Sequence, residues 1–177
     1  TLPSLTWDDL KAIQTELSTV KVAAPIMRTA AQVLSDDANW GTSVQGTTPE
    51  FLQVRAWPMA QGAVFTQGDV DGGAKVAVLG QTVVEKLYGA TANPVGQVIR
   101  MKSVPFTVVG VLAKKGQSPF GQDYDDVVLV PYTTFQQKLL GGLKNYIAGQ
   151  VVLSAVSADA TTRAQMQLRS LLRDRHR

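Results

Sequence analysis

The sequence predicts an α+β fold, in which helices and strands follow one another without an internal repeat. Leu10, Ile13 and Leu17 recur at helical spacing near the start of the chain. Residues 76–112 alternate in the pattern of a strand, a helix and a hairpin, and residues 157–177 carry an apolar helical stripe. At 177 residues, the chain is long enough for one domain or for two small ones that share a core.

The composition is that of a folded chain, with 45% hydrophobic and 18% charged residues. The formal net charge is only +3, and much of the positive excess falls in residues 163–177, which contain five arginines. These arginines are not interleaved with aromatic residues and match no groove-reading motif, so they are interpreted as a solvated helix face. No nucleic-acid partner is predicted.

Cysteine is absent, which removes disulfides, thiolate catalysis and cysteine-based zinc sites. No apolar run approaches the roughly 18 residues that cross a bilayer, and Thr1 begins no signal peptide. The abrupt start and the basic end suggest a piece of a longer protein.

The first third of the chain reads as a helix, two strands and a short helix. A capping pattern at Thr6 predicts a helix over residues 7–18. Residues 20–34 form an extended run that Pro25 places at a sheet edge, and residues 38–44 form its partner strand. A short helix follows in "GTTPEFLQV"; its predicted features are a cap from Thr47 or Thr48, Pro49 in the first turn and an end at Pro58.

The middle of the chain is expected to form one compact unit. Residues 68–73, "GDVDGG", are predicted as a loop, residues 74–80 as a buried strand and residues 81–89 as a helix closed by Gly89. Residues 93–96, "NPVG", have proline and glycine where a type I turn places them.

A hairpin is predicted for residues 98–112. Its first arm should bury Ile99 and Met101, and its second should bury Phe106, Val108 and Leu112, with Thr107, Val109 and Val111 on the opposite face. Gly110 is expected to mark a bulge. Ser103-Val104 lacks Asn-Gly chemistry, so a turn longer than two residues, ending at Pro105, is predicted.

The last third is expected to give a strand, a helix, a strand and a helix. "DDVVLVPYTTFQQKLLG" predicts a buried strand and then a helix capped by Thr133 or Thr134 and ended by Gly141. Residues 146–156 predict a strand, and residues 157–177 predict the terminal helix.

The residue types that carry chemistry are poorly represented. His176 is the sole histidine and lies next to the end of the chain, and "GQSPFG" at residues 116–121 misses the nucleophile-elbow spacing. No phosphate-binding or dinucleotide motif occurs. A calcium loop starting at Asp69 fails because Gly80 stands where the bidentate glutamate belongs.

Two further groups were weighed as sites. Asp123, Asp125 and Asp126 could gather a cation, but carboxylates alone are a weak signal, and a loop before a buried strand explains them better. The tryptophans are interpreted as core or interface residues rather than a stacking platform; they are Trp7, Trp40 and Trp57. We therefore predict no catalytic, cofactor-binding or metal-binding residues, and no enzyme activity or nucleotide binding in this chain.

The order of the segments resembles the periplasmic core domain of MacB-type (FtsX-like) ABC transporter permeases. The segments that carry the resemblance are "VQGTTPEFLQV", "QGAVFTQGD", "AKVAVLGQTVVEKLYGATANPVGQVIRMKSVPFTVVGVL" and "DDVVLVPYTTFQQKLLG". It covers residues 5–175, and its most specific part is residues 76–112. Departures are local: Ala63 stands where the family often has Arg, and Ser103 where Gly is common.

The resemblance implies a domain on the periplasmic side of the bacterial inner membrane. It implies a porter-like α/β subdomain built from residues 1–46 and 143–177, with a Sabre-like subdomain, residues 47–142, inserted between them. Movement driven by a cytoplasmic ATPase would reach this domain and act with a periplasmic adaptor protein, a TolC-like outer-membrane channel and a second copy of the permease. The family supplies no catalytic residues.

Two alternatives remain at this point. One is a binding domain of a related permease that handles lipoproteins, peptides or a cell-wall hydrolase regulator. The other is a stand-alone enzyme, which the residue inventory disfavours. Neighbouring genes would discriminate between them, because flanking membrane helices and an ATPase indicate a transporter.

Overall fold

The computed structural model describes residues 20–139 and 150–155. The helices predicted for residues 7–18 and 157–177 lie outside these ranges, as do Trp7, Gly141 and His176. The strands are β1 (Val20–Leu34), β2 (Asn39–Thr47), β3 (Met59–Gly62), β4 (Val76–Leu79), β5 (Val98–Met101), β6 (Val104–Leu112), β7 (Val127–Pro131) and β8 (Gln150–Ala155). The helices are α2 (Glu50–Val54), α3 (Gln67–Gly72), α4 (Gln81–Leu87), α5 (Tyr132–Thr134) and the π-helix η1 (Phe135–Leu139).

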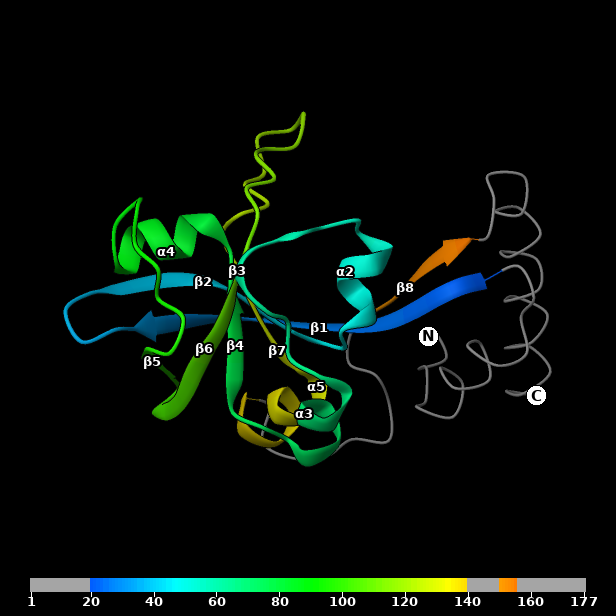
Figure 1. Ribbon diagram of the computed structural model, residues 1–177, viewed down its shortest axis with the longest axis horizontal. Coiled ribbons are helices and arrows are strands. Elements are labelled where there is room, and N and C mark those ends of the chain that lie inside the picture. Colours follow the sequence, from blue (N-terminus) through cyan, green and yellow to red (C-terminus); the bar gives the residue numbers. More distant parts are fainter. Residues whose placement is uncertain (1–19, 140–149, 156–177) are drawn as a thin grey trace.

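Six of the strands close into a hydrogen-bonded ring. The order is β2–β7–β4–β6–β5–β1, and β1 pairs back with β2. The pairs β2–β7 and β4–β6 are parallel and the others are antiparallel. Outside the ring, β3 pairs with β6 and β8 pairs with β1. Figure 1 shows β1 crossing the body, with β8 beside its beginning and the β1–β2 hairpin at its far end.

The prediction that β1 is an edge strand is wrong. From Met27 to Leu34 β1 pairs with β2, and its last two residues also pair with β5. From Val20 to Ile26 β1 pairs with β8. Pro25 falls in this second stretch, where β1 has one described partner strand, so its missing N–H is tolerated there.

Two apolar cores lie on the two faces of the ring strands. One contains residues from all six ring strands together with α4 and η1, among them Met27, Val44, Phe106 and Phe135. The other packs Phe51 and Trp57 against the strands, with further residues from α3, β4, β6 and β7. Every residue of β7 is buried, as its unbroken apolar sequence predicted.

The predicted unit over residues 76–112 is confirmed as a strand, a helix and a hairpin. Ile99, Met101, Phe106 and Val108 are fully buried. The predicted bulge is also present, because the β4 partner steps from Val108 to Gly110 and skips one residue. This extra residue reverses the facing that alternation predicted: Val111 shares a core with Phe106, and Leu112 joins the other core.

The hairpin turn is shorter than predicted. Met101 pairs with Val104, which leaves Lys102 and Ser103 as a two-residue turn. Their φ angles are +50° and +67°, and positive φ at both central residues is the mark of a type I′ turn. Lys102 and Ser103 thus form this turn without Asn-Gly chemistry, and the Lys102 ammonium donates a 3.1 Å hydrogen bond to the Leu139 carbonyl of η1.

The predicted type I turn at residues 93–96 is also displaced. Gln97 N–H donates to the Pro94 carbonyl at 2.9 Å, so the turn begins one residue later than expected. Gly96 occupies the third position with φ of +93°, a value that a type II turn requires there and that glycine adopts without strain.

Three helix boundaries differ from the sequence predictions. α2 has Pro49 at its N-cap and ends at Val54, and no side chain caps it. The Thr47 hydroxyl donates to the Pro25 carbonyl instead, and the buried Thr48 hydroxyl has no hydrogen-bond partner. The expected loop at residues 68–73 is largely helical: α3 begins with a capping box between Thr66 and Asp69. The predicted Thr133 or Thr134 cap is also wrong; these hydroxyls donate to the carbonyls of Val70 and Ala74.

The division into residues 1–46, 47–142 and 143–177 stays a prediction. Within the described residues, β1 has two successive partner strands: it pairs with β8 up to Ile26 and with β2 from Met27 onward.

Candidate functional site

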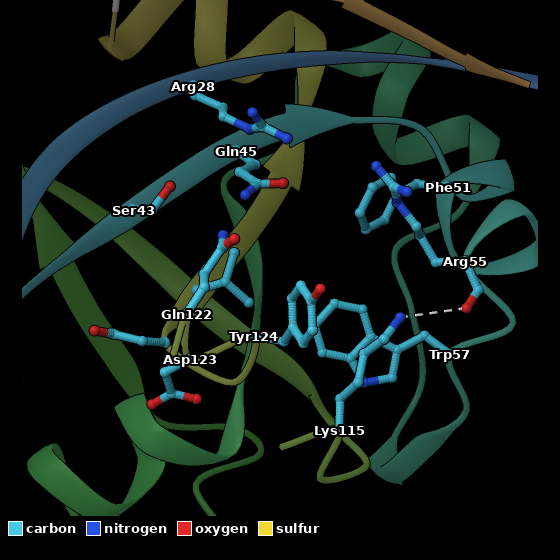
Figure 2. Close-up of a pocket in the computed structure, with 12 residues that line it drawn as sticks. Arg28, Ser43, Gln45, Phe51, Arg55, Trp57, Lys115, Gln122, Asp123 and Tyr124 are labelled. Carbon is cyan, nitrogen blue, oxygen red and sulfur yellow. Dashed lines mark hydrogen bonds between the residues drawn. The ribbon is translucent and has the colours of Figure 1, made fainter. Parts of the chain in front are cut away.

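A cleft of about 440 Å³ opens between the β1–β2 pair, α2 and the loop that joins β6 to β7. Figure 2 shows side chains from all of these elements facing the cleft. They are Arg28, Ser43, Gln45, Phe51, Arg55, Trp57, Lys115, Gln122, Asp123, Tyr124, Asp126 and Val127. A shallower hollow of about 720 Å³ runs on along β1 and β2 and shares Arg28, Ser43 and Asp126 with the cleft.

Lys115 joins the two sides of this cleft. Its ammonium lies 4.9 Å from the centre of the Trp57 ring and 5.6 Å from that of Tyr124. It also donates a 3.5 Å hydrogen bond to the Arg55 carbonyl, drawn as the dashed line in Figure 2. Because an ammonium is attracted to aromatic faces, these contacts hold the β6–β7 loop against the segment that follows α2.

The surroundings of Lys115 lower the pKa of its ammonium group. Desolvation lowers the pKa of Lys115, the nearby Arg55 charge lowers it further, and Asp125 acts in the opposite sense. Arg55 is itself placed over an aromatic ring, 5.7 Å from the centre of Phe51. The cleft therefore presents two cations that are each paired with aromatic faces.

The three aspartates that were weighed as a cation site serve the fold in different places. The buried Asp125 carboxylate accepts hydrogen bonds from the N–H groups of Lys115 and Gly116. Asp126 accepts from the Trp40 indole at 2.9 Å and from the Thr42 hydroxyl at 2.7 Å. Asp123 accepts from the Thr82 hydroxyl and from the N–H of Asp125.

The contacts of Asp123, Asp125 and Asp126 agree with their interpretation as loop residues before a buried strand. No group of three His, Cys, Asp or Glu side chains that could hold a metal is found among residues 24–139. Trp57 is buried and donates to the Ala113 carbonyl at 2.7 Å, and Trp40 is half-buried beneath the Lys86 ammonium, so both pack against the fold as predicted.

Sequence reasoning predicted no site residues and did not find this cleft. Trp57 and Lys115 belong to segments far apart in the chain, and no motif joins them. The one available signal was the pair of basic residues at the end of β6, followed by the "GQSPFG" loop. In the described part of the chain, no helix is both long enough and apolar enough to cross a membrane.

Comparison with solved structures defines the class of the fold. The periplasmic region of MacB from Actinobacillus actinomycetemcomitans matches with a TM-score of 0.82 and 22% identity over 99% of this chain and 76% of that one. The extracellular domain of the noncanonic ABC-type transporter YknZ from Gram-positive bacteria matches with a TM-score of 0.79 and 19% identity over 98% and 84%. The fold is that of extracytoplasmic transporter domains with mixed α/β content.

Sequence comparison then identifies the family. The model of the MacB-like periplasmic core domain matches residues 1–171. The chain belongs to this family, and it is a MacB-like periplasmic domain of an ABC transporter permease.

Three relatives illustrate the match. The macrolide export ATP-binding/permease protein MacB of Syntrophobacter fumaroxidans is 43% identical over 78% of this chain and 19% of its own length. The MacB protein of Rhodospirillum rubrum is 39% identical over 98% and 26%. The pyoverdine export ATP-binding/permease protein PvdT of Pseudomonas aeruginosa is 35% identical over 96% and 25%. The chain thus spans about a quarter or less of these relatives.

Proposed function

We propose that this domain transmits movement in an export pump. In this proposal, a cytoplasmic ATPase drives the parent permease, and the domain turns that movement into a conformational change on the periplasmic side of the inner membrane. The change expels substrates through a periplasmic adaptor protein and a TolC-like outer-membrane channel. The parent permease acts as a dimer. The names of the relatives, which are export ATP-binding/permease proteins, support an export role.

The observation that carries the proposal is the continuity of β1. This strand is fifteen residues long. Its first part pairs with β8, which comes from the other end of the chain, and its second part is built into the six-stranded ring. A displacement applied where β1 pairs with β8 would therefore reach the ring through one hydrogen-bonded strand.

The same arrangement supports two proposed subdomains. The porter-like unit, residues 1–46 and 143–177, would include the meeting of β1 with β8, and the Sabre-like unit, residues 47–142, would include α2. Residues 27–34 of β1 and all of β2 are nevertheless built into the same ring as β4–β7, so they would move with the Sabre-like unit. We infer that relative motion is concentrated near Ile26 and Met27, where β1 exchanges one partner for another, rather than at the boundary after residue 46.

A disulfide that locks the two units together tests the proposal. The chain has no cysteine, so introduced pairs can be crosslinked without removing native thiols. In the parent transporter, one cysteine is placed at the exposed Gln53 of α2 and a second at each position of β8 in turn, because α2 and β8 are neighbours. With the crosslink formed, we expect export to stop, ATP binding to remain and reductant to restore export.

A matched control crosslinks two strands inside the ring. Ala30 and Ser43 are direct partners in β1 and β2, so cysteines there join strands that already move together. This pair should leave export unchanged. Full export with the α2–β8 crosslink verified would show that relative motion of the two units is not part of the cycle.

A further inference from the structure

The helix that follows β7 changes its hydrogen-bonding pattern partway along. It begins as α5, which lies beside α3 (Figure 1), and Phe135 continues it into the π-helix η1 with helical φ and ψ angles of −57° and −49°. A π turn bonds residue i to residue i+5, so it holds one residue more than an α turn. Such turns are rare and are found frequently at functional sites. The extra residue in this helix therefore calls for an explanation.

Gln136, in this π turn, is buried without a hydrogen-bond partner for its amide nitrogen. Its side chain is 1% exposed, and no described residue accepts a hydrogen bond from its Nε2. Gln137 and Lys138 of the same turn are exposed to water. An amide group that loses its bonds to water and gains none destabilises the folded state. The stability of the described state therefore does not explain a glutamine at position 136.

η1 lies over the point where β1 changes its partner strand. Phe135 packs directly on Gly46, and Gly46 pairs with Met27 of β1. The preceding residue of β1, Ile26, pairs instead with Gln150 at the beginning of β8. Along the sequence, β8 is the strand that follows η1. A displacement of β8 relative to the ring would therefore act on the C-terminal end of η1, while Phe135 holds its beginning against the ring.

The C-terminal end of η1 is held by one hydrogen bond from the hairpin. The last carbonyls of a helix have no donor within the helix, and the Lys102 ammonium donates to the Leu139 carbonyl at 3.1 Å. Conversion of the π turn into an α turn would rotate the residues beyond it by roughly 100° about the helix axis. This rotation would carry the Leu139 carbonyl away from Lys102, so the bond from Lys102 favours the π form.

We propose that η1 is a switch between two helical registers that responds to movement of β8. In the described register it is a π-helix, Lys102 binds the Leu139 carbonyl and Gln136 Nε2 is unpaired. In the second register the turn is α-helical, Lys102 is released and the Gln136 amide turns to a position where it is hydrogen-bonded. Each helical N–H exchanges one carbonyl for the next, so backbone donors and acceptors stay paired in both registers.

The inference rests on the proposed function in taking relative motion near Ile26 and Met27 as the input to the switch. Deletion of Gln137 tests it, because the deletion removes the extra residue and leaves only the α register. Gln137 is exposed, so we expect the variant to fold, with a melting temperature within about 4 °C of the wild type. In the parent transporter, export should fall at least about tenfold, because the domain no longer alternates between two states.

The matched control for the deletion is Gln137→Ala. Alanine removes the same side chain but keeps the number of residues in the turn, so both registers stay available. Export by this variant should be unchanged. If the deletion variant does not fold, the following substitution decides the question.

Gln136→Met keeps the length of the chain and removes the buried amide. Methionine has about the volume of glutamine, so it stabilises the described register: the melting temperature should rise by about 2–4 °C, and export should fall roughly 5- to 30-fold. Gln137→Met, at the exposed neighbouring position, is the control and should alter neither quantity. A purely structural role for Gln136 predicts the opposite sign for stability, because loss of a needed amide would lower the melting temperature.

A third measurement detects the two registers without transport. NMR relaxation dispersion on the 177-residue chain should show microsecond-to-millisecond exchange at the N–H groups of residues 136–139. Deletion of Gln137 should abolish this exchange, because one register is left. The N–H groups of α4, an α-helix of the same domain, are the internal control and should show no exchange.

The outcomes separate the switch from the proposed function. Normal export by either folded variant, or an absence of exchange at residues 136–139 in the wild-type chain, would overturn the switch. The proposed function would stand in that case if the α2–β8 crosslink still stops export. Full export with that crosslink would overturn both proposals, because the input to the switch would then be absent.

Discussion

The buried carboxylate of Asp125 accepts a 2.7 Å hydrogen bond from the backbone N–H of Lys115, ten residues earlier in the chain. Its second oxygen accepts a 2.9 Å bond from the N–H of Gly116. One side chain thus binds two consecutive N–H groups and closes the base of the β6–β7 loop.

We expect Asp125→Asn to destabilise the domain by about 1–3 kcal/mol. An amide has one acceptor oxygen, so its NH₂ group would face one of two backbone donors and leave that donor unsatisfied. Urea denaturation followed by circular dichroism measures the change. Asp71→Asn on the exposed surface of α3 is the control and should change the free energy of unfolding by less than about 0.5 kcal/mol. Equal stability of the two variants would show that the hydrogen bonds from the Lys115 and Gly116 N–H groups to Asp125 do not stabilise the domain.

Phe106→Asp should destabilise the fold by more than about 3 kcal/mol. Phe106 is fully buried between ring strands, and an aspartate there would place an unpaired charge in an apolar core. Val98→Asp on the exposed face of the same hairpin serves as the control and should cost less than about 1 kcal/mol. The melting temperature reports both changes, and an unshifted value for Phe106→Asp would mean that this face of the hairpin is not core.

The elements whose pattern is local were predicted well. β4, α4 and β7 follow from apolar spacing and from the glycine and proline that bound them, and the alternation of β5 gave its buried face correctly. The facing of β6 was predicted correctly only as far as the bulge. A sequence can suggest a bulge at Gly110, but the pairing with β4 decides which residue is skipped, and that choice sets the facing of Val111 and Leu112.

The candidate cleft could not be predicted for a related reason. Its cation–aromatic contacts join Lys115 to Trp57 and Tyr124 and join Arg55 to Phe51, and only the contact with Trp57 crosses between distant segments. That contact depends on how the start of the β6–β7 loop packs against the segment that follows α2. Local periodicity contains no information about it, whereas the family resemblance recovered the fold through the order of whole segments.

The type I′ turn gives a prediction in the stabilising direction. Ser103 holds φ at +67°, where a side chain is disfavoured relative to glycine. Ser103→Gly should therefore raise the free energy of unfolding, by up to about 1 kcal/mol after the greater flexibility of glycine in the unfolded chain is counted. Lys102 is kept, because its ammonium binds the Leu139 carbonyl.

The control for this turn is Ser103→Ala. Alanine removes the hydroxyl but keeps the side-chain carbon that is disfavoured at positive φ, so it should give no gain. Guanidinium titrations of the three proteins measure the difference. A gain for alanine as large as that for glycine would place the effect in the hydroxyl rather than in the backbone.

Gly46 gives the last prediction. The boundary between the proposed subdomains falls after this residue, and a glycine there suggests a flexible hinge. In the structure Gly46 lies within β2, paired with Met27 on one side and Val130 on the other. A Cβ at this position would come within 2.5 Å of the Phe135 Cβ, so glycine is required by the close approach of η1.

Gly46→Ala should consequently destabilise the domain by at least about 1–3 kcal/mol, since Phe135 is fully buried and its Cβ cannot turn away from the strand. Gly72→Ala is the matched control, because a Cβ at the end of α3 meets nothing within 4 Å. That control should be neutral or slightly stabilising. Calorimetric unfolding of both variants distinguishes the two roles of Gly46: a hinge glycine would tolerate alanine with unchanged stability, and a packing glycine lowers the melting temperature when it is replaced.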